Sequence, residues 1–301
     1  MTSWLDPKLD VVFKILFADP SNKDLLLSLL SAVLRPSEPI VNADVLNPDL
    51  PKELAGDKGI VLDLRLKLSG DRYVDVEMQS DPRQGVRKRA LYYWARMYGQ
   101  QLFRGMEYTA LEPCVSIFFM GYSELPGKRF HSIFRVLEVH DQELYGDQLE
   151  LHMVELPKVP GLAGAAKEAE DPEGQLAAWG TFLRARSEEA LQELAMMNPV
   201  FEKAKKALEA LSGRPDVQEI ARQRELALLT YKLELGEARA AGKAEGKAEA
   251  LVLVLERRFG KLPSDLLTRV GEAKTAQLEA WLDRAVDGGT LDAVFDPPSQ
   301  H

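Results

Sequence analysis

The stretch from residue 60 to residue 79 constrains the fold more than any other part of the sequence. If the Ser-Gly-Asp segment 69–71 is a three-residue loop, facing residues have numbers that sum to 140. Apolar residues then face each other on one side, as Leu64 and Val76 do, and polar or charged residues face each other on the other side. A slip of one residue would mix the two kinds on both faces. The pattern therefore predicts an antiparallel hairpin with a fixed register.

This register places two acidic residues directly opposite each other. Asp63 faces Glu77, and cross-strand neighbours have Cβ atoms about 4.5–5.5 Å apart. Like charges at that separation destabilise a hairpin unless a proton or a cation neutralises them. Oxygen ligands favour a hard ion such as Mg²⁺ or Mn²⁺. A solvated face with mixed charges explains the same pattern, since Arg65 faces Asp75, and the hairpin alone leaves both interpretations open.

The periodicity elsewhere predicts an α/β unit followed by helices. We expect helices near 9–18, 25–34 and 83–104, with a capping box at 21–24 before the second, and strands near 60–68, 73–79, 114–120, 130–138 and 148–155. The order of elements is thus α-α-β-β-α-β-β-β. The expected domains are 1–156 as the α/β domain, 157–174 as a linker, 175–235 as a helical region, 236–250 as a low-complexity connector and 251–296 as a small helical domain.

Bulk composition excludes several classes of protein. The chain has 301 residues and one cysteine, Cys114, so a disulfide framework and a cysteine zinc site are excluded. The start lacks the pattern of a signal peptide, and no apolar run is long enough for a membrane span. We therefore expect a cytoplasmic protein that does not enter the membrane. His131, His140 and His152 lack metal-ligand spacing and are expected to be structural.

The helix expected at 83–104 is a local positive element in a chain of net charge −9. It contains six basic residues and no acidic one, with aromatic residues between them. Such a segment is typical of phosphate binding. Ordinary solvated charges beside core aromatics are the alternative, with Tyr92, Trp94 and Tyr98 expected to face the core. The residues expected to bind DNA are Arg83, Arg87, Lys88 and Arg89.

Three segments resemble the recombination-promoting nucleases, also known as PD-(D/E)XK nuclease-family transposases. They are the Asp-Val-Val-Phe-Lys segment that begins at Asp10, the pair formed by Asp63 and Glu77-Met-Gln79, and the Arg-Ala-Leu-Tyr-Tyr-Trp segment 89–94 leading to Gly-Met-Glu-Tyr at 105–108. The likeness covers about residues 5–155. It implies a restriction-endonuclease-like mixed sheet flanked by helices, followed here by an all-helical C-terminal region.

The resemblance also implies a function and a site. It implies Mg²⁺-dependent cleavage of DNA phosphodiesters, with Mn²⁺ as another suitable ion, and Asp63, Glu77 and the Met78 carbonyl as metal ligands. Gln79 stands where the wider superfamily usually has lysine, and a glutamine can position a water but cannot act as a base or a cation. Three further residues match positions of the family and are candidates for support of the site: Asp10, Lys14 and Tyr92. For Asp10 and Lys14 the candidate role is to reach into the site from the first helix, whereas Tyr92 is assigned no specific role. Asp10 and Lys14 are also spaced to pair with each other.

Three hypotheses about function follow. The first is a Mg²⁺-dependent DNA endonuclease acting in recombination or on mobile-element DNA. The second is a catalytically weak, nuclease-derived module that binds DNA or protein, which Gln79 and the acidic net charge motivate. The third is an assembly protein whose C-terminal helices recruit a partner or a second copy of the chain.

Overall fold

The computed structural model describes residues 4–46, 64–82, 85–161, 171–185 and 187–295. Their contacts divide the chain into two compact units, Met1–Ala227 and Leu228–His301. In the first unit the helices and strands are α1 Asp10–Ala18, α2 Lys23–Leu34, β1 Ala43–Val45, β2 Leu64–Leu68, β3 Tyr73–Gln79, α3 Val86–Gly99, β4 Cys114–Met120, β5 His131–Arg135, β6 Leu149–Glu155, α5 Pro172–Arg184, α6 Glu188–Met197 and α7 Pro199–Ser212. Short 3₁₀ helices lie at Pro20–Asn22 (η1), Tyr108–Ala110 (η3) and Leu156–Lys158 (η4).

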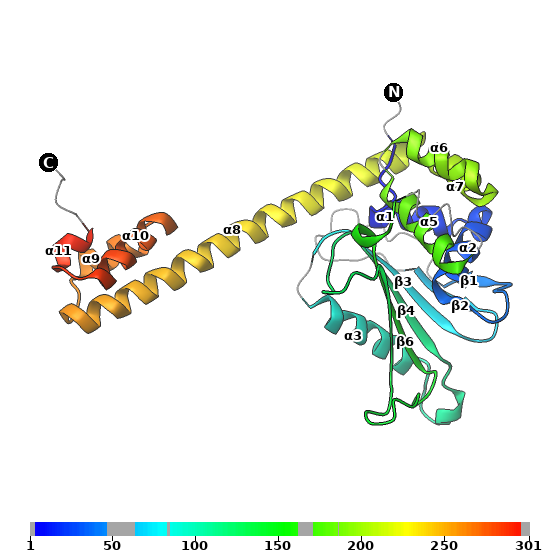
Figure 1. Ribbon diagram of the computed structural model, residues 1–301, viewed down its shortest axis with the longest axis horizontal. Coiled ribbons are helices and arrows are strands. Elements are labelled where there is room, and N and C mark those ends of the chain that lie inside the picture. Colours follow the sequence, from blue (N-terminus) through cyan, green and yellow to red (C-terminus); the bar gives the residue numbers. More distant parts are fainter. Residues whose placement is uncertain (1–3, 47–63, 83–84, 162–170, 186, 296–301) are drawn as a thin grey trace. The chain divides into compact units, whose positions relative to one another are not determined.

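The strands form one mixed sheet of six in the order β1-β2-β3-β4-β6-β5. The pairs β3–β4 and β4–β6 are parallel, whereas β1–β2, β2–β3 and β5–β6 are antiparallel. Helix α3 lies over one face of the sheet, while α1, α2 and α5 lie on the other face (Figure 1). The predicted α/β class with a mixed sheet flanked by helices is therefore confirmed.

The hairpin β2–β3 has the predicted register over its described part. Leu64 pairs with Val76, and Arg65 pairs with Asp75. The expected pair of Asp63 and Glu77 falls at residue 63, which lies outside the described residues. The alternative interpretation of this face as solvated does not hold for β3, because all its residues from Val74 to Gln79 are buried. The reason is that α3 packs over that face and β4 continues the sheet beside it.

An aromatic cluster fills the core on the face opposite α3. The ring of Phe13 lies 6.0 Å from that of Phe119, and Phe17 lies 5.7 Å from Trp179. Trp179 also donates a hydrogen bond from Nε1 to the Ser28 hydroxyl at 3.1 Å. Helix α5 therefore packs directly on α1 and α2, so residues 171–227 share a compact unit with the α/β domain rather than lying apart from it.

The start of α2 differs from the sequence-based prediction. The capping box predicted at 21–24 is absent, because Ser21 lies within η1 and its neighbour Asn22 makes no capping hydrogen bond with its side chain. Asp19 caps η1 instead, since its carboxylate accepts from the Ser21 amide. Strand β1 was not predicted, because three residues are too few to display an alternating pattern.

Helix α8 Pro215–Phe259 spans the boundary between the two units and contains the low-complexity segment 236–250. Its closely spaced glycines therefore do not interrupt the helix, although each costs about 1 kcal/mol relative to alanine. In the second unit α8 is followed by α9 Ser264–Gly271, α10 Thr275–Asp287 and α11 Leu291–Phe295. These helices pack around Leu255 and around Trp281, whose ring lies 4.9 Å from Phe295.

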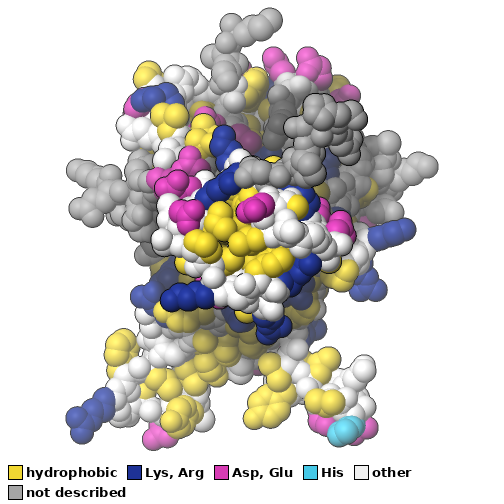
Figure 2. All heavy atoms as spheres, turned by 90° about the vertical axis from the view of Figure 1, so that its left-hand side faces the viewer, with side chains coloured by type: hydrophobic (Ala, Val, Ile, Leu, Met, Phe, Trp, Pro, Cys, Tyr) yellow, Lys and Arg dark blue, Asp and Glu magenta, His cyan; other side chains and the backbone are white. Residues whose placement is uncertain are grey.

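The two ends of α3 differ in character. Its first turn contains Arg87, Lys88 and Arg89, whereas its last turn leads into a loop with exposed Phe103 and Tyr108. The hairpin that follows β5 exposes further apolar side chains. Figure 2 shows hydrophobic side chains gathered on two projections at the lower end of the molecule. Three of the four cations of α3 therefore lie at its opposite end from the exposed apolar loop, and Arg96 lies in its last turn.

Candidate active site

Glu77 lies on β3 and its side chain is completely buried, with 0% of it exposed. Its Cα partner on β4 is Phe118, which belongs to the apolar cluster beneath α3. Side chains alternate along a strand, so Asp75 and Gln79 share this face with Glu77, and both are also buried. The site is thus a line of polar side chains on a central strand, enclosed between the sheet and α3.

The Glu77 carboxylate is buried without hydrogen bonds. Neither of its oxygens has a hydrogen-bond partner among the described residues. Glu155, at the end of β6, is equally buried but accepts from the amides of Glu124 and Leu125 and from the Lys158 ammonium, at 2.6, 3.0 and 2.6 Å. An uncompensated buried charge costs several kcal/mol. The two glutamates thus differ, because protein groups donate to the Glu155 carboxylate, whereas no described residue donates a hydrogen bond to Glu77.

Arg89 brings a positive charge to this site from α3. Its Nη2 lies 3.8 Å from Glu77 Oε2, which is too long for a hydrogen bond, and it donates instead to Gln79 Oε1. Its Nε is buried with no hydrogen-bond partner in the described part of the chain. The sequence placed Arg89 among the DNA-binding residues but did not predict its contact with Gln79. The available signal was its position near the start of the helix that follows β3.

The Gln79 amide is fixed at both ends. Its Nε2 donates to the Asp81 carbonyl at 3.0 Å, so its Oε1 faces Arg89. Beside it the ends of β3 and β4 are in close contact. A Cβ at Gly121 would lie 2.5 Å from the Ser80 carbonyl oxygen, so a larger residue there would force the backbone apart. The end of β3 that carries Gln79 is therefore held rigidly.

The backbone carbonyl of Met78 points to the β2 side of β3. Backbone groups of successive residues point to opposite edges of a strand. The Gln79 carbonyl accepts from Gly121 on the β4 side, so the Met78 carbonyl points to the β2 side. The described part of β2 begins at Leu64, which pairs with Val76. The Met78 carbonyl thus lies at the edge from which Asp63 would approach in the predicted register, although Asp63 itself is not described.

The predicted DNA-binding residues of α3 occupy different environments. Arg87 and Lys88 are exposed, and Arg87 pairs with Glu124 at 3.1 Å, whereas the Arg89 side chain is 19% exposed. Arg83 lies outside the described residues. The prediction that Tyr92 faces the core is wrong, since 61% of it is exposed. Its neighbour Tyr93 packs on the core instead, because residues three or four apart, such as Ala90 and Tyr93, share a helix face.

The two candidate support residues of α1 are both buried. Asp10 accepts hydrogen bonds from Arg224 of α8, with distances of 3.0 and 2.9 Å from Nε and 2.5 Å from Nη2. Arg224 is 1% exposed, so this is a buried ion pair between α1 and the start of α8. The sequence did not predict it, because 214 residues separate the two partners.

A divalent metal fits the donors that are described, but they do not complete a site. Glu77 offers two carboxylate oxygens without hydrogen bonds, and Met78 offers a carbonyl, which are the hard oxygen ligands that Mg²⁺ prefers. Within the described ranges no group of three or more His, Cys, Asp or Glu residues is clustered as a metal site. The second carboxylate expected from the sequence, Asp63, lies outside those ranges.

Other titratable groups near the sheet are structural. Burial raises the pKa of the Cys114 thiol to about 12, so this side chain is a poor nucleophile. On the face opposite Glu77, His131 Nε2 lies 2.9 Å from His152 Nδ1, and His152 Nε2 lies 2.6 Å from Glu150 Oε1. Burial, and then the neighbouring His152, lower the pKa of His131 to about 3. This series of hydrogen bonds gives both His131 and His152 a polar partner, as expected for structural histidines.

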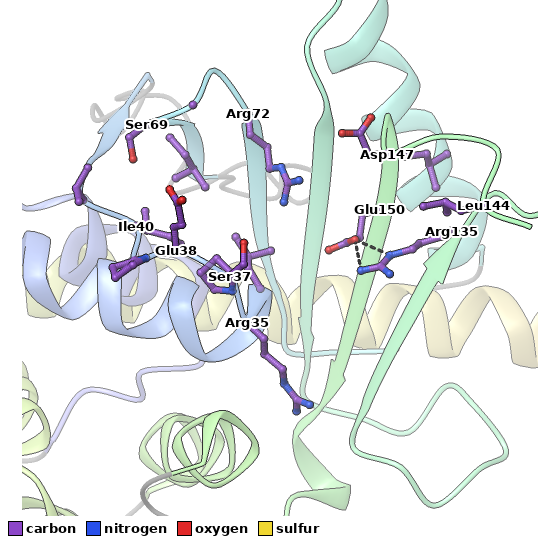
Figure 3. A pocket seen from close by; sticks show the side chains of 17 residues that line it. Arg35, Ser37, Glu38, Ile40, Ser69, Arg72, Arg135, Leu144, Asp147 and Glu150 are labelled. Carbon is purple, nitrogen blue, oxygen red and sulfur yellow. Dashed lines mark hydrogen bonds and ion pairs between the residues drawn. The ribbon is translucent and has the colours of Figure 1, made fainter.

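A cavity of about 710 Å³ lies apart from Glu77, beside the loop that follows α2. Figure 3 shows Arg35, Arg72 and Arg135 around it, together with acidic side chains that offset their charge. Arg135 pairs with Glu150 at 2.7 Å. None of the residues predicted to form the active site lines this cavity.

The mixed sheet, its flanking helices and the buried acidic side chain on β3 define a PD-(D/E)XK-like α/β protein. A family model described as PD-(D/E)XK nuclease family transposase matches residues 7–238, well over half of the chain. The chain therefore belongs to this family. No curated protein and no solved structure matches it.

Membership supports a nuclease- or transposase-like role with DNA as the substrate, and nucleases of this kind typically use divalent metal ions. The match extends through α5, α6 and α7 and into α8, beyond the region of resemblance noted in the sequence. The helices that pack on the sheet are thus part of the family domain. No helix in the described ranges is long and apolar enough to cross a membrane.

Proposed function

We propose that the chain is a Mg²⁺-dependent DNA endonuclease that acts in recombination or on mobile-element DNA. The observation that carries the proposal is the Glu77 carboxylate, which is fully buried and receives no hydrogen bond from a described residue. A carboxylate in that environment is stabilised by a proton or by a cation, and the guanidinium of Arg89, 3.8 Å away, balances only part of its charge. The family supports the second choice, because its members' nuclease chemistry typically uses a divalent ion.

Asp63, Glu77 and the Met78 carbonyl are the proposed metal ligands. In the predicted hairpin register Asp63, which precedes Leu64, takes the position opposite Glu77, and the Met78 carbonyl points to the same edge of β3. Bound Mg²⁺, or Mn²⁺, lowers the pKa of a water molecule and polarises the phosphate. Arg89 balances part of the negative charge of the ligands, and the rigid end of β3 keeps Glu77 in place.

The first turn of α3 is the proposed DNA-binding surface. Arg87 and Lys88 are exposed, Arg89 lies next to Glu77, and Arg83 precedes them in sequence. Backbone phosphates are bound by cations without regard to base sequence. This surface therefore accounts for DNA binding by a chain of net charge −9. We assign Asp10 and Lys14 to support of the site from α1, and no role to Tyr92.

One observation favours the second candidate, a binding module with weak catalysis. Both polar ends of the Gln79 amide are already engaged, by Asp81 and by Arg89. The amide is therefore less able to position an attacking water than a free glutamine would be. In this alternative the fold and the cations of α3 are kept for binding, and turnover is slow even with metal.

Nicking of supercoiled plasmid separates the two candidates. We expect the purified chain to nick plasmid with Mg²⁺ but not with excess EDTA, and Asp63→Ala to abolish nicking. Asp44→Ala, which removes an exposed acid of β1, should leave the rate unchanged. Nicking by Asp63→Ala at the rate of the unaltered chain would overturn the assigned site. DNA binding without nicking, in both Mg²⁺ and Mn²⁺, would favour the binding module.

A further inference from the structure

We infer that Arg89 is a catalytic residue that supplies the positive charge missing at position 79; this inference rests on the proposed function. A glutamine in that position cannot act as a cation. The structure brings a guanidinium to the same place from α3, through the contact between Arg89 and Gln79. The two residues together replace the lysine that is usual in the wider superfamily.

The hydrogen bond of Arg89 directs its Nη2 to Gln79 rather than to Glu77. A simple structural ion pair would have a nitrogen-to-oxygen distance of about 2.7–2.9 Å. The observed distance to Glu77 Oε2 is 3.8 Å, and Nη2 donates to Gln79 instead. The Glu77 oxygens consequently stay available for a metal, while the guanidinium stays within reach of an anion held at that metal.

Gln79 is the residue that makes this arrangement possible. The Asp81 carbonyl fixes the orientation of the amide, so that its oxygen and not its nitrogen faces Arg89. A lysine at position 79 would present a second positive charge to Arg89 and repel it. A glutamine at 79 and an arginine at 89 are therefore mutually dependent.

The unused donor of Arg89 has a defined chemical partner. Its buried Nε has no hydrogen-bond partner among the described residues, and such a donor is costly to leave unpaired. A phosphoryl oxygen of the substrate satisfies it. In hydrolysis a water oxygen bonds to phosphorus, the bond to the leaving ester oxygen breaks, and the proton of the water passes to solvent or a base. The negative charge that develops on the phosphoryl oxygens is stabilised by the guanidinium, which takes no proton itself.

Variants that remove the positive charge at position 89, or restore one at position 79, test this inference. Arg89→Ala should lower the nicking rate at saturating Mg²⁺ by about 10²–10³-fold, the usual effect of removing one donor to a developing oxyanion. Its affinity for a labelled duplex, measured by fluorescence anisotropy in Ca²⁺, should fall by less than about tenfold, because only one phosphate contact is lost. Arg135→Ala, which removes an arginine paired with a carboxylate on the opposite face, should behave as the unaltered chain.

The double variant Arg89→Ala/Gln79→Lys gives the decisive comparison. It should recover at least about tenfold of the nicking rate lost in Arg89→Ala, whereas Gln79→Lys alone should be slower than the unaltered chain. Arg89→Gln, which keeps a polar side chain but without the charge, replaces Arg89→Ala if the alanine variant does not fold. Nicking by Arg89→Ala or Arg89→Gln within a few-fold of the unaltered rate, or a double variant no faster than Arg89→Ala, would overturn the inference.

Failure of the proposed function gives a different result. In that case the unaltered chain does not nick with Mg²⁺ or Mn²⁺, whatever stands at position 89. The anisotropy measurement then decides the inference on its own. Equal duplex affinities of the unaltered chain and Arg89→Ala would show that Arg89 does not contact phosphate, whereas a weaker variant beside an unchanged Arg135→Ala would support the contact.

Discussion

Glu77 and Glu155 show how two buried carboxylates in one sheet are stabilised differently. Two backbone amides and a lysine bind Glu155, whereas no described residue donates to Glu77. Removal of the charge at each position should therefore have opposite effects on stability. At Glu155 it takes away the charge that three donors bind. At Glu77 it removes a buried charge that receives no hydrogen bond from a described residue and that Arg89, 3.8 Å away, balances only in part.

The first prediction concerns Glu77→Gln. We expect loss of metal-dependent nicking with an unfolding free energy equal to or above that of the unaltered chain without metal, because a buried charge is removed. The matched control Glu155→Gln should be destabilised by about 1–3 kcal/mol, since its donors lose their charged acceptor. Urea unfolding in EDTA measures both. A destabilisation of Glu77→Gln as large as that of Glu155→Gln would show that Glu77 is structural.

The second prediction concerns acid stability and His131. Its pKa is lowered from 6.5 to about 3 by burial and by His152, so the unfolded chain takes up the proton first as the pH falls. The contribution of the neutral His131 to the free energy of unfolding is therefore fully present above about pH 6.5, and it is lost as the pH falls from that value to about 3. His131→Gln should lose less stability between pH 7.5 and pH 5, measured by urea unfolding. An unchanged loss in His131→Gln, equal to that of the exposed-site control His140→Gln, would contradict this account.

Glu150 adds to the same acid sensitivity at lower pH. Burial by itself raises the pKa of this carboxyl, but hydrogen bonds from His152 and Arg135 outweigh burial and lower the pKa from 4.5 to about 2. A carboxylate with a lowered pKa stabilises the fold above its unfolded value, and its contribution is lost as the pH falls from 4.5 to 2. This pH range lies below the range of pH 7.5 to 5 used for His131. A measurement at pH 5 therefore reports the contribution of His131 with little change from Glu150.

At the scale of elements, the sequence predicts best where a pattern is local. The hairpin register is specified by alternating apolar residues on both strands, and pairs such as Leu66 with Val74 follow it. The burial of the second face of β3 could not be predicted from the hairpin, because it depends on α3 and not on the strand itself. Tyr92 was misjudged for a related reason, since the aromatic residues of α3 are consecutive and do not mark one face of the helix.

The third prediction concerns the first turn of α3. Replacement of Arg87 and Lys88 together by alanine should flatten the slope of log affinity against log salt by up to about two units on duplex DNA. The pair of Arg87 with Glu124 is exposed, so its exchange for a phosphate costs little and the melting temperature should move little. Fluorescence anisotropy at several salt concentrations gives the slope.

An unchanged slope would move the DNA-binding surface elsewhere. The alternative in the helical region consists of Arg214 and Arg222, which are exposed and paired with Asp216 and Glu219. Arg224, two residues after Arg222, is not part of this surface, because it is buried against Asp10. The double variant Arg214→Ala/Arg222→Ala therefore serves as the control, with the slope of the unaltered chain as the expected result.

At the scale of the whole molecule, the long-range contacts are what the sequence could not predict. Helices α5 and α7 pack on α1 and α2, and the start of α8 is tied to α1 through Arg224 and Asp10. Amphipathic periodicity predicts that a helix packs, but it does not identify the surface on which it packs. The packing of α5, α6 and α7 in one unit with the sheet, and the extent of the family match, therefore come from the fold and the comparison and not from periodicity.

The fourth prediction tests the buried pair between α1 and α8. Arg224→Met leaves the Asp10 carboxylate buried without this partner and should destabilise the first unit by about 3–5 kcal/mol. The double variant Asp10→Leu/Arg224→Met removes both charges and should be clearly more stable than Arg224→Met alone. Urea unfolding of the full chain, followed by the fluorescence of the tryptophans, measures both. A double variant as unstable as Arg224→Met would show that the ion pair is not the source of the effect.

Mn²⁺ binding followed by electron paramagnetic resonance tests the central claim most directly, because it detects the metal site without requiring turnover. The account predicts a saturable site in the unaltered chain, with which Mg²⁺ competes, and its loss in both Glu77→Gln and Asp63→Ala. Glu155→Gln should keep the site, since the donors of that carboxylate are already protein groups. Equal Mn²⁺ binding by the unaltered chain, Glu77→Gln and Asp63→Ala, or no saturable binding by any of them, would contradict the account.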